Sequence, residues 1–189
     1  MFAESKKIVL CTGARTPIGH ISRSLSTMKP EGLMKMAIEA LLQRSKLPKD
    51  AVDGLLVGWV WQSFSAPNIA RVSLLNCGMP EKAQAVTVQN NCVSSIEAIS
   101  SAARFILTGE GELYLAGGTE CMSRLPYTIE GSRAMKELRS MATVKAKWND
   151  LLQSQEVAVI DAMEEGLTDP VKKINMAGTA EVCAQMYGV

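Results

Sequence analysis

Apolar residues in this chain follow two different periods. Short apolar runs of the kind that buried strands carry occur at Lys7–Cys11, Val52–Val60, Ala85–Val88 and Leu113–Ala116. Between these runs, apolar residues recur every three or four positions, which is the period of an amphipathic helix. The pattern predicts the order β-α-β-α-β-α-β and therefore an α/β fold, with a largely parallel or mixed sheet covered by helices.

Three helices are expected between the strands. The first spans Gly32–Ser45, the second opens at Asn68–Val72, and the third begins directly behind Cys92 and ends at Gly109. The expected apolar face of the first helix consists of Leu33, Met36, Ala37, Ala40 and Leu41. The expected apolar face of the third consists of Val93, Ile96, Ile99, Ala102, Ala103, Ile106 and Leu107.

The regular alternation stops after Ser123. A helix is predicted over Glu156–Glu165, a turn over Gly166–Pro170, and a last helix that starts near Thr179 and runs to Tyr187. The chain is therefore divided into residues 1–123 and 124–189.

Composition narrows the choice of function. With 189 residues, 47% of them hydrophobic, the chain is long enough for a real core. A net charge of +1 and an aromatic content of 5% argue against nucleic-acid binding. No run is apolar and long enough to span a membrane. The five cysteines form no C-x-x-C pair, so no metal site is indicated, and a reducing cytoplasm or organelle matrix is expected.

Cys92 is the candidate for chemistry. It stands between a strand and a helix, where the helix dipole and unpaired N–H groups favour the thiolate and could hold an oxyanion. The alternative is a buried structural cysteine. Both interpretations stay open on the local pattern alone.

Two turns around this helix resemble the thiolase family. Residues 91–95 read N-C-V-S-S, and residues 115–123 read L-A-G-G-T-E-C-M-S. Thiolases carry an N-x-x-C-G/A-S-G/S turn and, one helix later, an A-G-G-x-E-x-M-S turn. The resemblance implies that Cys92 is the acyl-accepting nucleophile. Val93 departs from the family's Gly or Ala, and Ser95 from its commonest Gly.

The resemblance extends from about Lys7 to Val189. It includes G-A-R-T-P-I-G at residues 13–19, V-D-G-L-L-V-G-W-V at residues 52–60 and G-L-T-D-P at residues 166–170. It implies that residues 1–123 form a thiolase-like N-terminal half and residues 124–189 part of an irregular, helical loop domain on the acyl-CoA side. Met176 matches a family methionine that lies against the acyl group, although ordinary core packing would also satisfy this residue.

The implied function is acyl transfer on coenzyme A thioesters, by Claisen condensation or thiolysis of 3-ketoacyl-CoA, with no cofactor beyond these substrates. Thiolases also need a G-H-P and a C-x-G-G-G turn, and both are absent here. His20, the only histidine, lies in a loop where exposure and a structural role are expected. A second chain or a longer parent protein is therefore expected, in a homo- or hetero-oligomer. The alternatives are a ketoacyl or hydroxymethylglutaryl-CoA synthase-like condensing enzyme and a non-catalytic subunit that organises a partner.

Overall fold

The computed structural model describes residues 7–130, 150 and 158–189. It divides the chain into two compact units, Met1–Arg124 and Leu125–Val189. Among the described residues, no helix is long and apolar enough to cross a membrane.

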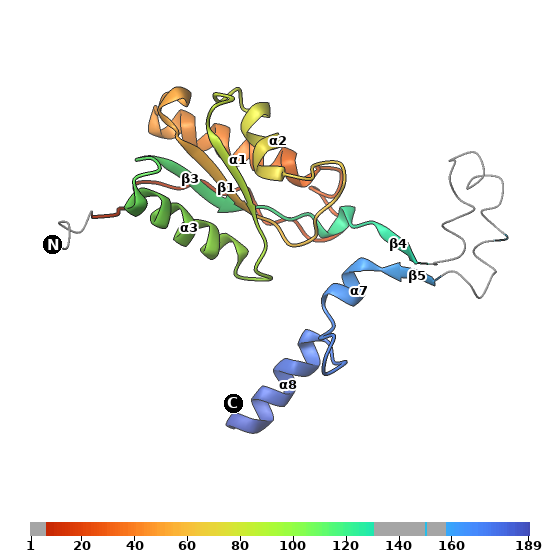
Figure 1. The fold of residues 1–189 in the computed structure, drawn as a ribbon. Coiled ribbons are helices and arrows are strands. Elements are labelled where there is room, and N and C mark those ends of the chain that lie inside the picture. The colour runs from red at the N-terminus through yellow and green to blue at the C-terminus, as the bar shows by residue number, and fades with distance from the viewer. Residues whose placement is uncertain (1–6, 131–149, 151–157) are drawn as a thin grey trace. The chain divides into compact units, whose positions relative to one another are not determined.

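The first unit is built on a parallel sheet of three strands (Figure 1). They are β1 (Gly54–Gly58), β2 (Gln84–Val88) and β3 (Tyr114–Gly118), in the order β2-β1-β3. Leu56 of β1 lies opposite Val86 of β2 and Ala116 of β3. The α/β class and three of the four predicted strands of this unit are confirmed.

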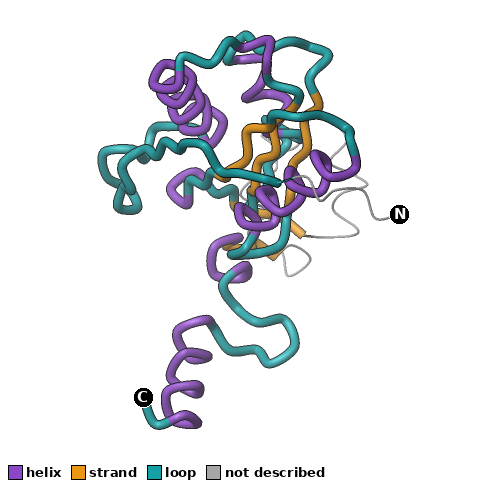
Figure 2. Tube along the Cα trace, turned by 90° about the vertical axis from the view of Figure 1, so that its left-hand side faces the viewer, coloured by secondary structure: helices purple, strands orange, loops and turns teal. Residues whose placement is uncertain are grey.

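Three helices connect and cover these strands: α1 (Pro30–Ser45), α2 (Ile69–Asn76) and α3 (Ser94–Thr108). Two short 3-10 turns, Lys49–Ala51 and Met122–Arg124, complete the unit. In Figure 2 the strands (orange) run between the helices (purple). The start of α2 is fixed by Asn68, whose side chain accepts a hydrogen bond from Arg71 N at 2.9 Å.

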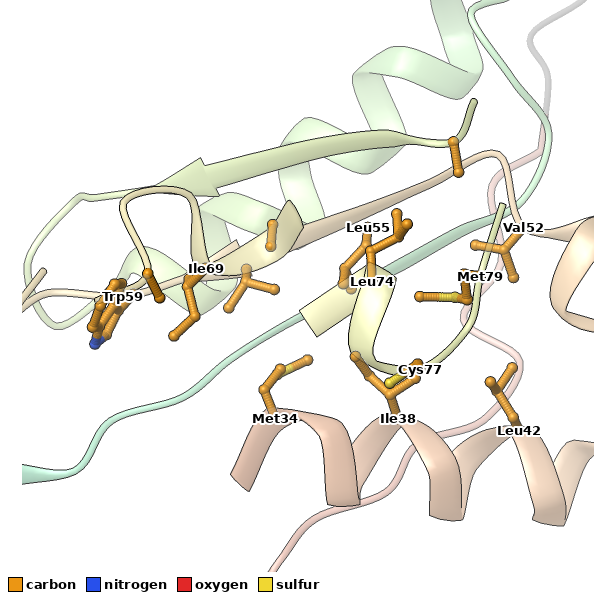
Figure 3. Packing of buried hydrophobic residues seen from close by; sticks show 14 residues of the cluster. Met34, Ile38, Leu42, Val52, Leu55, Trp59, Ile69, Leu74, Cys77 and Met79 are labelled. Atoms are coloured by element: carbon orange, nitrogen blue, oxygen red, sulfur yellow. The ribbon is translucent and has the colours of Figure 1, made fainter. Parts of the chain in front are cut away.

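The two faces of the sheet are packed unequally. Helices α1 and α2 bury a large cluster against Leu55 of β1 (Figure 3). Its buried members are Met34, Ile38, Leu42, Val52, Leu55, Val57, Trp59, Ala66, Ile69, Ala70, Leu74, Cys77, Met79 and Ala83. On the opposite face, only Leu56, Ala98 and Ala102 form a second buried cluster, beneath α3.

The predicted apolar faces of α1 and α3 were wrong in detail. Helix α1 buries Leu33, Met34, Ile38 and Leu42, while Met36 is 47% exposed. Helix α3 buries its small residues Ser94, Ala98 and Ala102, because it lies close to the sheet. Of its large apolar residues, Phe105 packs against the buried cluster beneath the helix, whereas Ile96, Ile99 and Leu107 are 65%, 37% and 54% exposed, and Val93, just before the helix, is 49% exposed.

The predicted strand at Lys7–Cys11 is also wrong. These residues carry no regular secondary structure, and Val9 and Leu10 are 61% and 82% exposed. A strand is stable when it pairs along an edge and buries a face, and this run does neither within the described part of the chain.

The second unit contains a two-stranded antiparallel ribbon of β4 (Tyr127–Glu130) and β5 (Ala158–Asp161). Two helices follow, α7 (Ala162–Gly166) and α8 (Met176–Tyr187). The predicted helix at Glu156–Glu165 is wrong over Ala158–Asp161, which pairs as β5, and its first two residues lie outside the described ones. Helix α8 is confirmed, but Asn175 rather than Thr179 caps it, by accepting a hydrogen bond from Gly178 N at 2.8 Å.

Candidate active site

Cys92 lies in the turn that joins the carboxyl end of β2 to the start of α3. Its side chain is exposed. The turn is tight because Asn91 adopts a left-handed conformation, with φ of 46°, and asparagine tolerates this region better than most residues. Because its side chain is exposed, Cys92 is not the buried structural cysteine that the local sequence pattern had left as an alternative.

Ser94 holds this turn in place. Its hydroxyl donates to Asn91 O at 2.6 Å and accepts from Asn90 N at 2.8 Å. The side chain is only 3% exposed, so solvent does not compete for these bonds. The N–H groups of Val93 and Ser94 donate to Asn90 O and Asn91 O at 3.2 and 3.1 Å, so neither is available to an oxyanion beside Cys92.

Two glycines allow α3 to start this close to the sheet. A Cβ atom on Gly58 would lie 2.6 Å from the backbone of Ser94 and Ser95. A Cβ atom on Gly118 would overlap with Ser95 Oγ. Gly58 and Gly118 face each other at the carboxyl ends of β1 and β3, so the position of the cysteine turn depends on both.

Glu120 connects the segments that follow β1 and β3. Its Oε1 accepts from Trp59 Nε1 at 3.0 Å, and its Oε2 accepts from Val60 N at 3.0 Å. Trp61 N donates to the same Oε2 at 3.4 Å. Burial raises the pKa of the Glu120 carboxyl, and these hydrogen bonds act in the opposite direction. Glu120 therefore positions backbone at the same end of the sheet as Cys92.

A cleft of about 710 Å³ opens beside β3. Its walls come from residues 14–21, from α1, from the first half of α3 and from residues 116–123. Ser95 and Ile99 line it, but Cys92 does not. The cleft and the exposed thiol are thus separate features of the first unit.

The other candidate groups do not gather around Cys92. His20 is exposed, as expected, and its Nδ1 lies 2.9 Å from Ile21 O. Cys77 is buried, and burial raises the pKa of its thiol to about 11, which makes it unreactive at neutral pH. Within the described residues, no group of His, Cys, Asp or Glu could hold a metal ion.

Met176 belongs to the second unit, where it is the first residue of α8 and 45% exposed. Its N–H donates to Leu167 O at 3.0 Å. The exposed side chain is not part of a core, so the core-packing interpretation of Met176 does not hold.

Sequence reasoning did not assign roles to Ser94 and Glu120. Both stand in the motifs that carried the resemblance, beside Cys92 and after Gly117-Gly118. The signals that could have been used are a serine two residues after the candidate nucleophile and a carboxylate two residues after a double glycine.

Comparisons with known proteins agree with this fold. The model of a family described as thiolase, N-terminal domain, matches residues 8–189. An acetyl-CoA acetyltransferase of Cupriavidus necator is 30% identical over 183 residues, which are 96% of this chain and 42% of that protein. The crystal structure of the Bacillus anthracis acetyl-CoA acetyltransferase has a TM-score of 0.79 at 29% identity, covering 94% of this chain and 41% of that one.

Human mitochondrial 3-ketoacyl-CoA thiolase, solved in complex with CoA, gives a TM-score of 0.79 at 28% identity. The match covers 94% of this chain and 42% of the human chain. The chain therefore spans less than half the length of these proteins.

Proposed function

The chain belongs to the thiolase family through its N-terminal domain, and we propose that it supplies the nucleophile, Cys92, of an acyltransferase that acts on coenzyme A thioesters. The observation that carries the proposal is the exposed thiol of Cys92 in a turn fixed by buried Ser94. Relatives named acetyl-CoA acetyltransferase and 3-ketoacyl-CoA thiolase support this chemistry over the synthase-like alternative.

The proposed reaction has two steps. In the first, the Cys92 thiolate attacks the carbonyl carbon of an acyl-CoA, the C–S bond to coenzyme A breaks, and the CoA thiolate takes up a proton. In the second, a base removes an α-proton from acetyl-CoA, and the resulting carbanion attacks the acyl-Cys92 carbonyl. A 3-ketoacyl-CoA leaves and the thiolate is regenerated. Thiolysis is the same sequence reversed.

The second step needs a base, and the described residues of this chain offer no candidate beside Cys92. His20 is the only histidine of the sequence, and its ring nitrogen lies 2.9 Å from Ile21 O, within its own loop. The N–H groups of Val93 and Ser94 are already bonded. We therefore propose that a second polypeptide, or a longer parent protein, supplies the base, the activating histidine and the rest of the oxyanion site.

The surface of α3 supports such a complex. Val93, Ile96 and Leu107 expose apolar area on one helix that a soluble monomer would normally cover. Phe64, in the loop between β1 and α2, is fully exposed and supports a contact between copies of the chain around Trp59–Arg71. Light scattering at micromolar concentration tests this association, and a monodisperse monomer would contradict it.

Met176 has a proposed role as well. Its exposed side chain at the start of α8 is available to contact the acyl group. In the complete enzyme, Met176→Ala should change the relative kcat/KM for short and long acyl chains more than it changes the rate of Cys92 acylation.

Alkylation and acylation experiments test whether Cys92 is the nucleophile. Iodoacetamide near neutral pH should modify Cys92 before Cys11 and Cys183, which are also exposed, and the buried Cys77 last. Incubation of the purified chain with acetyl-CoA should add one acetyl group, slowly, at Cys92. Mapping by mass spectrometry that finds Cys11 or Cys183 modified first, with Cys92 inert, would contradict the proposal.

Turnover tests the need for a partner. The isolated chain should not catalyse repeated thiolysis of acetoacetyl-CoA, whereas the complex purified through a tag on this chain should. Cys92→Ser should abolish that activity, and Cys11→Ser is the matched control. Full activity of the Cys92→Ser complex would instead support the alternative of a non-catalytic organising subunit.

A further inference from the structure

The side chain of Glu120 bonds backbone at the point where two strands of the sheet end. Strands β1 and β3 finish opposite each other at Gly58 and Gly118, and Thr119 N still donates to Gly58 O at 3.1 Å. Beyond that bond a side chain joins the two segments, because Glu120 Oε2 accepts from Val60 N at 3.0 Å. The carboxylate thus continues the connection between β1 and β3 past their carboxyl ends.

Both carboxylate oxygens of Glu120 are engaged by neutral donors. Oε1 accepts from the indole Nε1 of Trp59 at 3.0 Å, and Oε2 accepts from Val60 N and, at 3.4 Å, from Trp61 N. Trp59 lies at one end of the core cluster (Figure 3) and is 1% exposed, so solvent does not compete for its indole N–H. With both oxygens engaged, Glu120 holds residues 59–61 rather than abstracting a proton from a substrate.

Residues 58 and 59 contact the cysteine turn on both sides of Cys92. Trp59 N donates to Val88 O at 3.0 Å, and Val88 is the last residue of β2, before the turn. Gly58 lies against the start of α3, after the turn, since a Cβ atom on Gly58 would be 2.6 Å from the carbonyl carbon of Ser94. A shift of this segment would therefore disturb both ends of the turn.

Two sets of bonds determine where the Cys92 thiol lies. Ser94 fixes the shape of the turn from inside, but its hydroxyl bonds only Asn90 N and Asn91 O, which belong to the turn itself. Such bonds do not fix the position of the turn on the sheet. Glu120 supplies that second constraint, because it holds the segment against which the turn is packed.

We propose that Glu120 is a positioning residue for the nucleophile, which holds residues 59–61 against the cysteine turn and thereby fixes the Cys92 thiol relative to the sheet. This inference rests on the proposed function, because acylation of Cys92 is the step that it affects. Attack on a thioester carbonyl needs the sulfur at a defined distance and direction, and a displacement of roughly 1 Å can slow such a step about a hundredfold. A loosened turn therefore slows acylation even though the thiol stays exposed.

Asp53 offers a matched control at the other end of the same sheet. Its Oδ2 accepts from Glu112 N at 2.7 Å and from Leu113 N at 3.0 Å, so it joins the residue before β1 to the residues before β3. Like Glu120, it is a carboxylate that accepts backbone N–H groups across the sheet. It lies at the amino ends of the strands, however, whereas Cys92 follows the carboxyl end of β2.

Acetylation and alkylation of Cys92 in the purified chain test the role of Glu120. Glu120→Gln leaves one carbonyl oxygen for donors that now use two oxygens, so acetylation of Cys92 by acetyl-CoA should become about tenfold slower or more. Alkylation by iodoacetamide should stay nearly unchanged, because a small reagent reaches an exposed thiol from many directions. Asp53→Asn should leave both rates nearly unchanged. Mass spectrometry of the cysteine peptides measures each rate.

A spectroscopic measurement separates positioning from a loss of stability. In proton–nitrogen correlation spectra of the folded chain, Glu120→Gln should shift the indole signal of Trp59 and the amide signals of Cys92 and Val93. Asp53→Asn should leave these three signals in place. Circular dichroism and urea unfolding establish that each variant folds.

Trp59→Phe tests the same contact from the other partner. It keeps an aromatic ring in the core and removes the indole N–H that bonds Oε1 of Glu120. Acetylation of Cys92 should fall in this variant too, by a smaller factor than in Glu120→Gln, because Val60 N keeps its bond to Oε2. If Glu120→Gln does not fold, Trp59→Phe decides the test.

The outcomes separate this inference from the proposed function. Acetylation of Cys92 at the unsubstituted rate in Glu120→Gln and Trp59→Phe overturns the positioning role and leaves the proposed function standing. An equal loss in Asp53→Asn overturns it as well, since the effect would then be one of general stability. Absence of acetylation at Cys92 in the unsubstituted chain, both alone and in the purified complex, contradicts the proposed function and, with it, this inference.

Discussion

The two compact units of the chain are held together by different means. Every buried hydrophobic side chain among the described residues belongs to the first unit, Met1–Arg124. Helices α7 and α8 of the second unit bury none of their residues. Their ends are fixed instead by single side chains, since Asp161 and Asn175 each cap a helix. The first unit thus has its own hydrophobic core, while the helices of the second unit have capped N-termini but no buried side chains.

The first unit carries most of the buried area of the described residues, whereas the second unit leaves apolar side chains uncovered. The first unit can fold around its own core and present Cys92 on it, because Ser94 and the two glycines are fixed by that core. The second unit offers Met176 and other apolar side chains without covering them. Buried area, rather than capping, supplies most of the free energy of folding, so substitutions in the two units should have unequal effects.

The largest effect is expected in the core of the first unit. Leu55→Ala should lower the free energy of unfolding by about 2–5 kcal/mol, because Leu55 is fully buried between the sheet and α1 and α2. Val182→Ala in α8, where the side chain is 47% exposed, should change it by less than about 0.5 kcal/mol. Urea unfolding followed by circular dichroism measures both, and equal losses would show that the two units share one core.

A smaller loss is expected from Asn68. This side chain caps α2 and bonds both Ala85 O and Thr87 Oγ1, at 3.1 and 2.9 Å. Asn68→Ala should therefore reduce the free energy of unfolding by about 1–2 kcal/mol. Asn76→Ala, an exposed asparagine at the end of the same helix, is the matched control and should have almost no effect. Identical urea midpoints for the two variants would contradict the role of Asn68.

Elements that depend on local periodicity could be predicted from the sequence, whereas the faces that helices bury could be predicted only in part. The strands β1, β2 and β3 and the helices between them follow from local periodicity, and so does the place of Cys92 before α3. The buried faces of α1 and α3 followed only in part, because Leu33 and Ala102 are buried as predicted but most other predicted members are not. In α3 the small residues Ser94 and Ala98 face the sheet because Gly58 lets the helix approach it, and such close approach is not visible in a hydrophobic pattern.

The remaining errors share one physical origin. Lys7–Cys11 has the composition of a strand but pairs with nothing described, and Ala158–Asp161 pairs with Tyr127–Glu130 although its local pattern is helical. In both places pairing with a distant segment decides the structure. The bonds of Glu120 to Trp59 and Val60 are also contacts between distant segments, so only the family motif could have pointed to this residue.

A still smaller effect, visible as a dependence on pH, is expected from Glu120. Burial raises the pKa of its carboxyl in the folded chain above the unfolded value of 4.5. The folded state therefore holds the proton more tightly, and this contribution to stability is complete below pH 4.5 and is lost as pH rises through the raised value.

Urea midpoints measured across this pH range should fall less steeply for Glu120→Gln than for the unsubstituted chain. Glu81→Gln, at an exposed position, should keep the original slope. A steeper fall in Glu120→Gln would contradict the assignment of the shift to burial.

The smallest effect on global stability is expected from Asn175→Ala, although this residue makes the same kind of bond as Asn68. Its side chain accepts from Gly178 N at 2.8 Å and caps α8, which buries no residue. Removing the cap should speed exchange of the Gly178 amide and fray the first turn, while the urea midpoint of the first unit stays unchanged. The two asparagine caps would then differ in effect because α2 is packed on a core and Asn68 also bonds Ala85 O and Thr87 Oγ1, whereas α8 buries no residue. A loss of about 1 kcal/mol in the global transition would instead mean that the two units unfold together.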